Sequence, residues 1–356
     1  MKLATTSADF GRFCTLSECL EHVRAAGFRC VDLSLSQDKR LFSEDEREWR
    51  SAAEEIGNKM AELGLTPVQA HSPNSNPFAE GKWERECFLG TRSLELCGLF
   101  GIPDLVVHGG YTIGMEHRPW FEKNKAFYEH LFPAAEKTGV YILTENTTKV
   151  NLPSGFYLYT GQEMTDFIEA IGHPLLEAVW DTGHGTTEGS QYDNIVALGR
   201  HLRGLHVHDN SGRSDDHAIP YTGVLNLDAV ICGLLDIGYK GCFTVEAERA
   251  LFSDKTSPRQ KFERDTRLAQ PTPEMLDAAE KLLQDLTTST QGNEIIDPLQ
   301  IFEVSVEFMH KVIDPRIAFS IVIISCFLVD IAARKFKWKW PHELVQDRKR
   351  KRAMSK

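Results

Sequence analysis

Histidines and carboxylates recur in this sequence at the ends of short apolar runs that have the composition of strands. They are His71, His108, Glu145, Asp181, His184, His208, Asp215, His217 and Glu246. Carboxylates gathered in one small volume would repel each other and raise their own pKa values. Divalent cations resolve this conflict, because they bind carboxylate oxygen and imidazole nitrogen together. The residue types therefore predict a site for a divalent metal, and Mn, Zn, Co and Mg all suit these ligands.

Short apolar runs alternate with longer amphipathic runs along residues 1–287. The predicted strands are 2–6, 28–35, 67–71, 104–109, 141–146, 176–182, 204–209 and 242–247, and the predicted helices are 16–26, 43–63, 82–100, 118–138, 161–171, 191–201, 226–237 and 273–287. Such alternation implies parallel strands joined by crossover helices. Eight units of this size predict an α/β fold, a closed (β/α)₈ TIM barrel. An open doubly wound sheet is the weaker alternative, because no Gly-x-Gly-x-x-Gly follows the first strand.

The clearest predicted helix covers residues 43–63. A Ser-x-x-Glu capping box, formed by Ser43 and Glu46, opens it, and Gly64 follows its last residue. Capping boxes and terminal glycines mark the two ends of helices. We therefore predict that Ser43 is the N-cap of this helix.

The barrel fold predicts where the polar residues meet. In a parallel barrel the carboxyl ends of all strands lie around one axis on one face. The third to the eighth strands would each direct a carboxylate or an imidazole toward that face. On the seventh strand we assign His208 to the site, and we expect His206 to face the surrounding helices.

These motifs resemble those of the xylose isomerase-like barrel superfamily, which also contains endonuclease IV. The resemblance covers roughly residues 1–287 and rests on Glu-Asn at 145–146, D-T-x-H at 181–184, H-x-H-D at 206–209, D-x-H at 215–217 and L-x-x-I-G-Y-x-G at 234–241. In the ketose isomerase and epimerase branch, it implies one metal bound by Glu145, Asp181, His208 and Glu246. In the endonuclease IV branch, it implies three zinc ions bound by all nine of the residues named above.

The resemblance and the chemistry of the residues favour an isomerase or epimerase acting on a sugar, keto-sugar or cyclitol. A metal acidifies the C–H bond beside a carbonyl, and Glu145 and Glu246 would then transfer the proton. Further metal or substrate ligands are expected among His71, His108, His184, Asp215 and His217. Arg213 is expected to contact substrate oxygens, and Trp180 to lie against a sugar ring.

The sequence is compatible with two other functions. One is a multi-metal hydrolase of the endonuclease IV type, which cleaves abasic sites or other phosphoesters. The other is a sugar-binding module without catalysis. Residues 334–356 contain ten Lys or Arg and two acidic residues, which gives this tail a formal net charge of +8. The whole chain has a formal net charge of −11, so the preceding 333 residues carry −19. An acidic body binds a phosphate backbone poorly, which counts against a nucleic-acid partner.

The composition changes after residue 287. Residues 288–316 have the composition of a linker, 317–333 are mainly apolar with Asp330 as their one charge, and 334–356 form a basic tail with Trp and Lys near its start. Residues 317–333 predict a membrane helix, or else a buried or interfacial one, so membrane association through 317–340 is expected. The cysteines lack a C-x-x-C pair and no secretory leader is visible, which predicts a cytoplasmic protein. An oligomer is compatible with these features, and 251–272 predicts a lid loop or a solvated insertion.

Overall fold

The computed structural model describes residues 1–10, 14–220 and 223–247. The predicted lid at 251–272, the predicted helix at 273–287, the linker at 288–316, the apolar segment at 317–333 and the basic tail at 334–356 lie outside these residues. Among the residues that are described, no helix combines the length and the hydropathy needed to cross a membrane.

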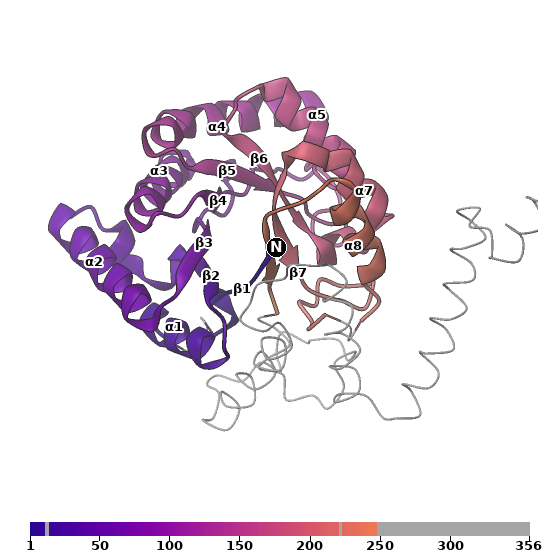
Figure 1. Cartoon of the computed structure of the whole chain (residues 1–356). Helices are drawn as coiled ribbons and strands as arrows, with labels where there is room; N and C mark the ends of the chain where they lie inside the picture. The colour runs from indigo at the N-terminus through magenta and orange to yellow at the C-terminus, as the bar shows by residue number, and fades with distance from the viewer. Residues whose placement is uncertain (11–13, 221–222, 248–356) are drawn as a thin grey trace, which may run out of the picture. The chain divides into compact units, whose positions relative to one another are not determined.

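Eight parallel strands close into a barrel in which β1 pairs with β8 (Figure 1). They are β1 (Lys2–Thr6), β2 (Cys30–Ser34), β3 (Thr66–His71), β4 (Asp104–Val106), β5 (Tyr141–Glu145), β6 (Leu176–Asp181), β7 (Leu202–Val207) and β8 (Cys242–Val245). Each strand pairs with the strands before and after it in the sequence. The predicted TIM barrel is therefore confirmed.

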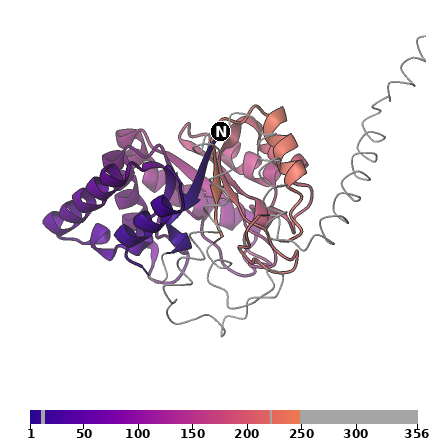
Figure 2. The ribbon, with the colours of Figure 1, turned by 60° about the horizontal axis from the view of Figure 1, so that its bottom comes forward.

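Helices surround the barrel, as Figures 1 and 2 show. They are α1 (Leu16–Ala25), α2 (Glu46–Leu63), α3 (Trp83–Phe100), α4 (His117–Thr138), α5 (Gly161–Ile171), α6 (Thr182–Gly185), α7 (Gln191–Leu198) and α8 (Leu227–Asp236). All of these except α6 coincide closely with a predicted helix. The short helix α6 is an addition to the prediction, and it carries part of the site described below.

The predicted start of α2 is wrong. Asp45 is its N-cap, and the Asp45 side chain accepts a hydrogen bond from the Arg47 N–H at 2.8 Å. Ser43 lies two residues earlier, and its hydroxyl accepts a hydrogen bond from the Asp45 N–H and donates one to the Glu48 carboxylate. Asp and Ser are about equally favourable N-caps, so the sequence pattern alone does not choose between them.

The barrel interior is filled below the mouth by apolar side chains. Val106, Leu143 and Val179 form a buried cluster on three neighbouring strands. Leu143 lies two residues before Glu145, and Val179 lies two residues before Asp181. Since residues two apart on a strand share a face, both carboxylates stand above this apolar layer, inside the barrel.

Two glycine substitutions are expected to affect stability in opposite directions. A Cβ atom added to Gly161 would lie 2.0 Å from the Asn194 carbonyl oxygen, whereas one added to Gly57 in α2 would meet Phe100 at an ordinary 3.8 Å. Gly161→Ala should lower the free energy of unfolding by about 1–3 kcal/mol, because backbone cannot move aside easily. Gly57→Ala should raise it by up to about 1 kcal/mol, because alanine favours helix. Urea unfolding measures both, and equal effects would contradict the packing described.

Candidate metal centre

Polar side chains converge at the carboxyl ends of the strands. They fall into four groups whose ligand atoms lie within 4.8 Å of one another: Glu145, Asp181, His206 and Glu246; His184, His208, Asp215 and His217; His71, His108 and Glu145; and Asp32, His71 and His206. All nine predicted residues belong to a group. Asp32 and His206 join them, although neither was assigned to the site from the sequence.

The first group, which we call the glutamate site, consists of Glu145, Asp181, His206 and Glu246. The Glu145 carboxylate is buried, with Oε1 2.7 Å from His206 Nδ1 and Oε2 2.7 Å from His108 Nε2. His206 Nδ1 also lies 3.4 Å from Glu246 Oε2. Three carboxylates and one imidazole, with ligand atoms within 4.8 Å of one another, are a donor set that suits Mn²⁺, Mg²⁺, Co²⁺ or Zn²⁺. The residues present therefore fit a divalent cation.

The expected orientation of His206 is wrong. Its ring is fully buried, and its two nitrogens contact Glu145 and Gln69 inside the barrel. His206 lies within β7, whereas His208 follows the last residue of that strand, Val207. Side chains along β7 alternate between the interior and the surrounding helices, and the contacts with Gln69 and Glu145 put His206 on the interior side. His206, rather than His208, thus completes the glutamate site.

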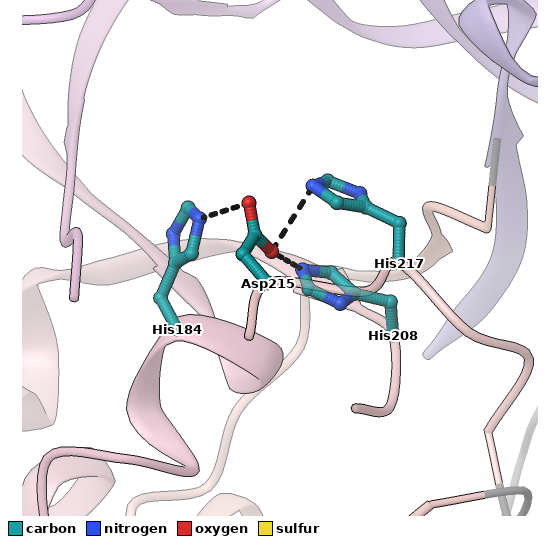
Figure 3. Close-up of side chains that lie close together, drawn as sticks. All are labelled: His184, His208, Asp215 and His217. Carbon is teal, nitrogen blue, oxygen red and sulfur yellow. Dashed lines mark ion pairs between the residues drawn. The ribbon is translucent and has the colours of Figure 1, made fainter. Parts of the chain in front are cut away.

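The second group, the histidine site, consists of His184, His208, Asp215 and His217 (Figure 3). Asp215 lies at its centre. Its Oδ1 is 3.3 Å from His217 Nε2 and 3.8 Å from His208 Nε2, and its Oδ2 is 3.6 Å from His184 Nε2. The rings of His208 and His217 are stacked with centroids 4.0 Å apart. Three imidazoles therefore direct the same ring nitrogen toward one carboxylate.

The opposite nitrogen of each imidazole faces a backbone carbonyl. His184 Nδ1 lies 2.9 Å from the Asn146 oxygen, His217 Nδ1 3.3 Å from the Glu246 oxygen, and His208 Nδ1 3.5 Å from the Asp209 oxygen. A carbonyl oxygen only accepts, so each Nδ1 donates a proton to it. Metal-binding histidines are commonly oriented in this way, with the other nitrogen left for the metal. Three nitrogens and one carboxylate are a donor set typical of zinc.

Asp181 connects the two sites through the short helix α6. Its side chain is the N-cap of α6, and Oδ1 accepts a hydrogen bond from the His184 N–H at 2.7 Å. Its Oδ2 lies 3.0 Å from His208 Nε2. Gly183 leaves room for this arrangement, because a Cβ atom there would lie 1.9 Å from the His208 ring. The D-T-G-H motif at 181–184 thus builds the junction between the two sites.

Asp209 holds the connection between β7 and α8, which carries Asp215 and His217. This carboxylate accepts hydrogen bonds from the N–H groups of Asn210, Gly223 and Leu225, each at 2.8 Å. His217 has a φ of +44°, a conformation that side chains other than glycine rarely adopt. Such conformations persist only where the surrounding structure enforces them. The connection is therefore built to present these two side chains.

Charge coupling dominates the electrostatics of both sites. Burial raises the pKa of Glu145, but the His206 and His108 imidazoles outweigh it and hold that pKa well below its usual value. Burial lowers the pKa of His71, but Asp32 raises it to about 10. Burial also lowers the pKa of His184, but the Asp181 and Asp215 carboxylates outweigh it and raise that pKa well above 6.5. Without a cation, the raised pKa values of His71 and His184 favour protonated imidazoles beside Asp32, Asp181 and Asp215.

Metal affinity is accordingly expected to rise with pH. A metal binds neutral imidazole, so it must displace protons from His71 and His184, whose pKa values are raised in the metal-free protein. Between pH 6 and 8 the Co²⁺ association constant should increase about tenfold per pH unit for each proton released. Competition with a chelator at several pH values measures this dependence. A constant affinity over that range would contradict the proton displacement.

The remaining predicted residues lie in different surroundings. His108 is at the mouth, with 45% of its side chain exposed, and Arg213 is exposed on the connection between β7 and α8. Trp180 is fully buried, and its Nε1 donates to Gln191 Oε1 at 2.9 Å. The Trp180 ring therefore fills the layer between β6 and α7, and it has no face free for a sugar.

Comparisons with known proteins agree with this fold. A family model described as "Xylose isomerase-like TIM barrel" matches residues 20–272. The uncharacterised protein y4fM of Sinorhizobium fredii is 22% identical over 232 residues, which are 60% of this chain and 71% of that protein.

Two solved structures share the architecture. A D-psicose 3-epimerase from Clostridium cellulolyticum has a TM-score of 0.62 at 18% identity, covering 81% of this chain and 98% of that one. An AP endonuclease of family 2 from Brucella melitensis has a TM-score of 0.57 at 16% identity, covering 70% and 93%. At these identities both likenesses concern the fold alone. The family match spans more than half of the chain, which therefore belongs to the xylose isomerase-like TIM barrel family.

Proposed function

We propose that the protein is a divalent-metal-dependent isomerase or epimerase acting on a sugar, keto-sugar or cyclitol. The observation that carries this proposal is the glutamate site, in which Glu145 from β5 and Glu246 from the end of β8 share one ligand group with Asp181 and His206. An epimerase needs a proton acceptor and a proton donor on opposite sides of one carbon. Two carboxylates from β5 and the end of β8, strands that β6 and β7 separate in the barrel, would provide that pair.

In this proposal Glu145, Asp181, His206 and Glu246 bind the metal. A bound divalent cation polarises a carbonyl and acidifies the adjacent C–H bond. Glu246, with 15% of its side chain exposed, removes or returns the proton on one face of the carbon. Glu145 acts on the other face, and its deep burial keeps water away from that step.

Residues near the mouth would orient the substrate. His108 is exposed and contacts Glu145, so its ring can bind a substrate hydroxyl beside the reacting carbon. Arg213 lies on an exposed connection, from which it can approach substrate oxygens. His71 is held behind His108, with the ring centroids 6.2 Å apart. We propose His71 as a further metal or substrate ligand.

Proton exchange with solvent tests this function directly. The metal-loaded protein is incubated in D₂O with a panel of ketoses and keto-inositols, and deuterium at the carbon beside the carbonyl is measured by NMR. We expect incorporation with at least one member of the panel, loss of incorporation with a chelator, and recovery when Mn²⁺ or Co²⁺ is restored. Binding of a sugar without any exchange would contradict the isomerase and favour a sugar-binding module.

A second candidate function is a multi-metal hydrolase that cleaves phosphoesters. The histidine site favours it, because its donor set is typical of zinc and it is joined to the glutamate site through Asp181. Neighbouring metals can stabilise the attacking and the leaving oxygen of a phosphoester together. Nicking of abasic duplex DNA at low salt would support this function, and its absence would remove the DNA version.

A further inference from the structure

A carboxylate on β2 lies beneath the candidate metal centre. Asp32 is fully buried, and its Oδ2 lies 2.9 Å from His71 Nδ1, 2.9 Å from Gln69 Nε2 and 3.7 Å from His206 Nε2. Burying a charge is costly unless it is paired and hydrogen-bonded. Every partner named here is an imidazole or amide that also faces the centre. Asp32 is therefore placed to act on the His71 and His206 rings.

The contact with His71 fixes which nitrogen of that ring is free. A carboxylate only accepts hydrogen bonds, so His71 Nδ1 donates to Asp32. Nε2 of His71 is then the nitrogen available to the group that His71 forms with His108 and Glu145. A carboxylate that binds the outer nitrogen of a histidine in this way holds the ring in place and makes the inner nitrogen a better ligand.

The contact with Gln69 connects Asp32 to the His206 ring on β7. Gln69 lies opposite Asp32 in the pairing of β2 with β3. Its amide nitrogen faces Asp32, because two acceptors would repel, and the same nitrogen lies 2.7 Å from His206 Nε2. Gln69 therefore contacts both the Asp32 carboxylate and the His206 ring, and it fixes the place of that ring, whose Nδ1 faces Glu145 and Glu246.

We infer that Asp32 is a positioning residue for metal binding, which orients His71 directly and holds the His206 ring in place through Gln69. The inference rests on the proposed metal-dependent function. It assigns no chemistry to Asp32, which lies behind both rings. We call these two sets of contacts, Asp32 to His71 and Asp32 through Gln69 to His206, the two relays. Together they connect β2 and β3 to the ligands on β5, β7 and β8.

The test measures Co²⁺ affinity of the full chain by chelator competition, with the visible Co²⁺ spectrum as a second readout. We expect Asp32→Asn and Gln69→Leu each to weaken binding about 10–100-fold and to change the spectrum, as loss of outer partners of metal ligands typically does. Asp104→Asn is the matched control. Asp104 is a largely buried carboxylate paired with Arg203 at the other end of the barrel, 2.8 Å from its Nε, so the variant should lose stability but keep its Co²⁺ affinity.

A combined variant separates positioning from a general loss of stability. In a Gln69→Leu/His71→Ala background, Asp32→Asn should cause no further loss of Co²⁺ affinity, because both relays are already broken. Wild-type affinity in both Asp32→Asn and Gln69→Leu, or a further loss in the combined variant, would overturn the inference. A wild-type protein that binds Co²⁺ but exchanges no sugar proton would instead refute the proposed function and leave the role of Asp32 intact.

Discussion

Glu246→Gln is expected to lower kcat for proton exchange by about 10²–10⁴-fold, the usual contribution of a positioned acid or base. Glutamine keeps the shape of the side chain and can still offer an oxygen to the metal, but it cannot take up a proton. Glu145→Gln should lower both kcat and metal affinity. Both Glu145 oxygens lie 2.7 Å from an imidazole nitrogen, and an amide NH₂ would face one of them.

The comparison needs a glutamate that is chemically equivalent but lies elsewhere. Glu122 is exposed on α4, so Glu122→Gln should leave exchange and metal content unchanged. Deuterium incorporation, kcat, KM and thermal stability are measured for the three variants. Full exchange in both Glu145→Gln and Glu246→Gln would rule out proton transfer by these two carboxylates.

Asp181→Asn is expected to weaken metal binding at both sites while preserving the fold. Asp181 caps α6 through the His184 N–H, contacts His208 at 3.0 Å and belongs to the glutamate site. Asparagine is an equally good N-cap, so helix α6 should persist while the negative charge is lost. Metal affinity should fall on the order of 10²-fold or more, because loss of an outer partner alone costs about 10–100-fold.

Asp45→Asn is the control for this variant, since Asp45 caps α2 and belongs to none of the four groups. It makes the same chemical change at a helix start without touching the candidate metal centre. Elemental analysis and Co²⁺ titration compare the two proteins. If Asp181→Asn bound metal as tightly as Asp45→Asn, the shared role of Asp181 would be wrong.

The barrel and most of the site were predictable from the sequence, because strand ends and ligand types coincide along the chain. Glu145 and Asp181 end β5 and β6, and alternation along the strand sends both inward. The D-T-x-H motif placed His184 one helical turn after Asp181. These inferences need only local spacing and the rule that parallel strands share one open face.

The wrong predictions have separate physical causes. β7 ends at Val207, so His206 stays in the strand while His208 enters the following connection and joins another group. Asp32 has no motif around it. Its one signal in the sequence is that it is a carboxylate within a run that is expected to be a buried strand. Trp180 precedes an inward residue, and alternation turns it toward α7.

Metal content by elemental analysis is the most direct test of the proposed centre, on protein purified without a chelator or a His-tag. The wild type is compared with His206→Ala and with the double variant Asp215→Ala/His217→Ala. The proposed isomerase predicts about one metal per chain that persists in the double variant and is lost in His206→Ala, whether or not the histidine site adds a second. Metal that disappears in the double variant and persists in His206→Ala would contradict a catalytic metal at the glutamate site.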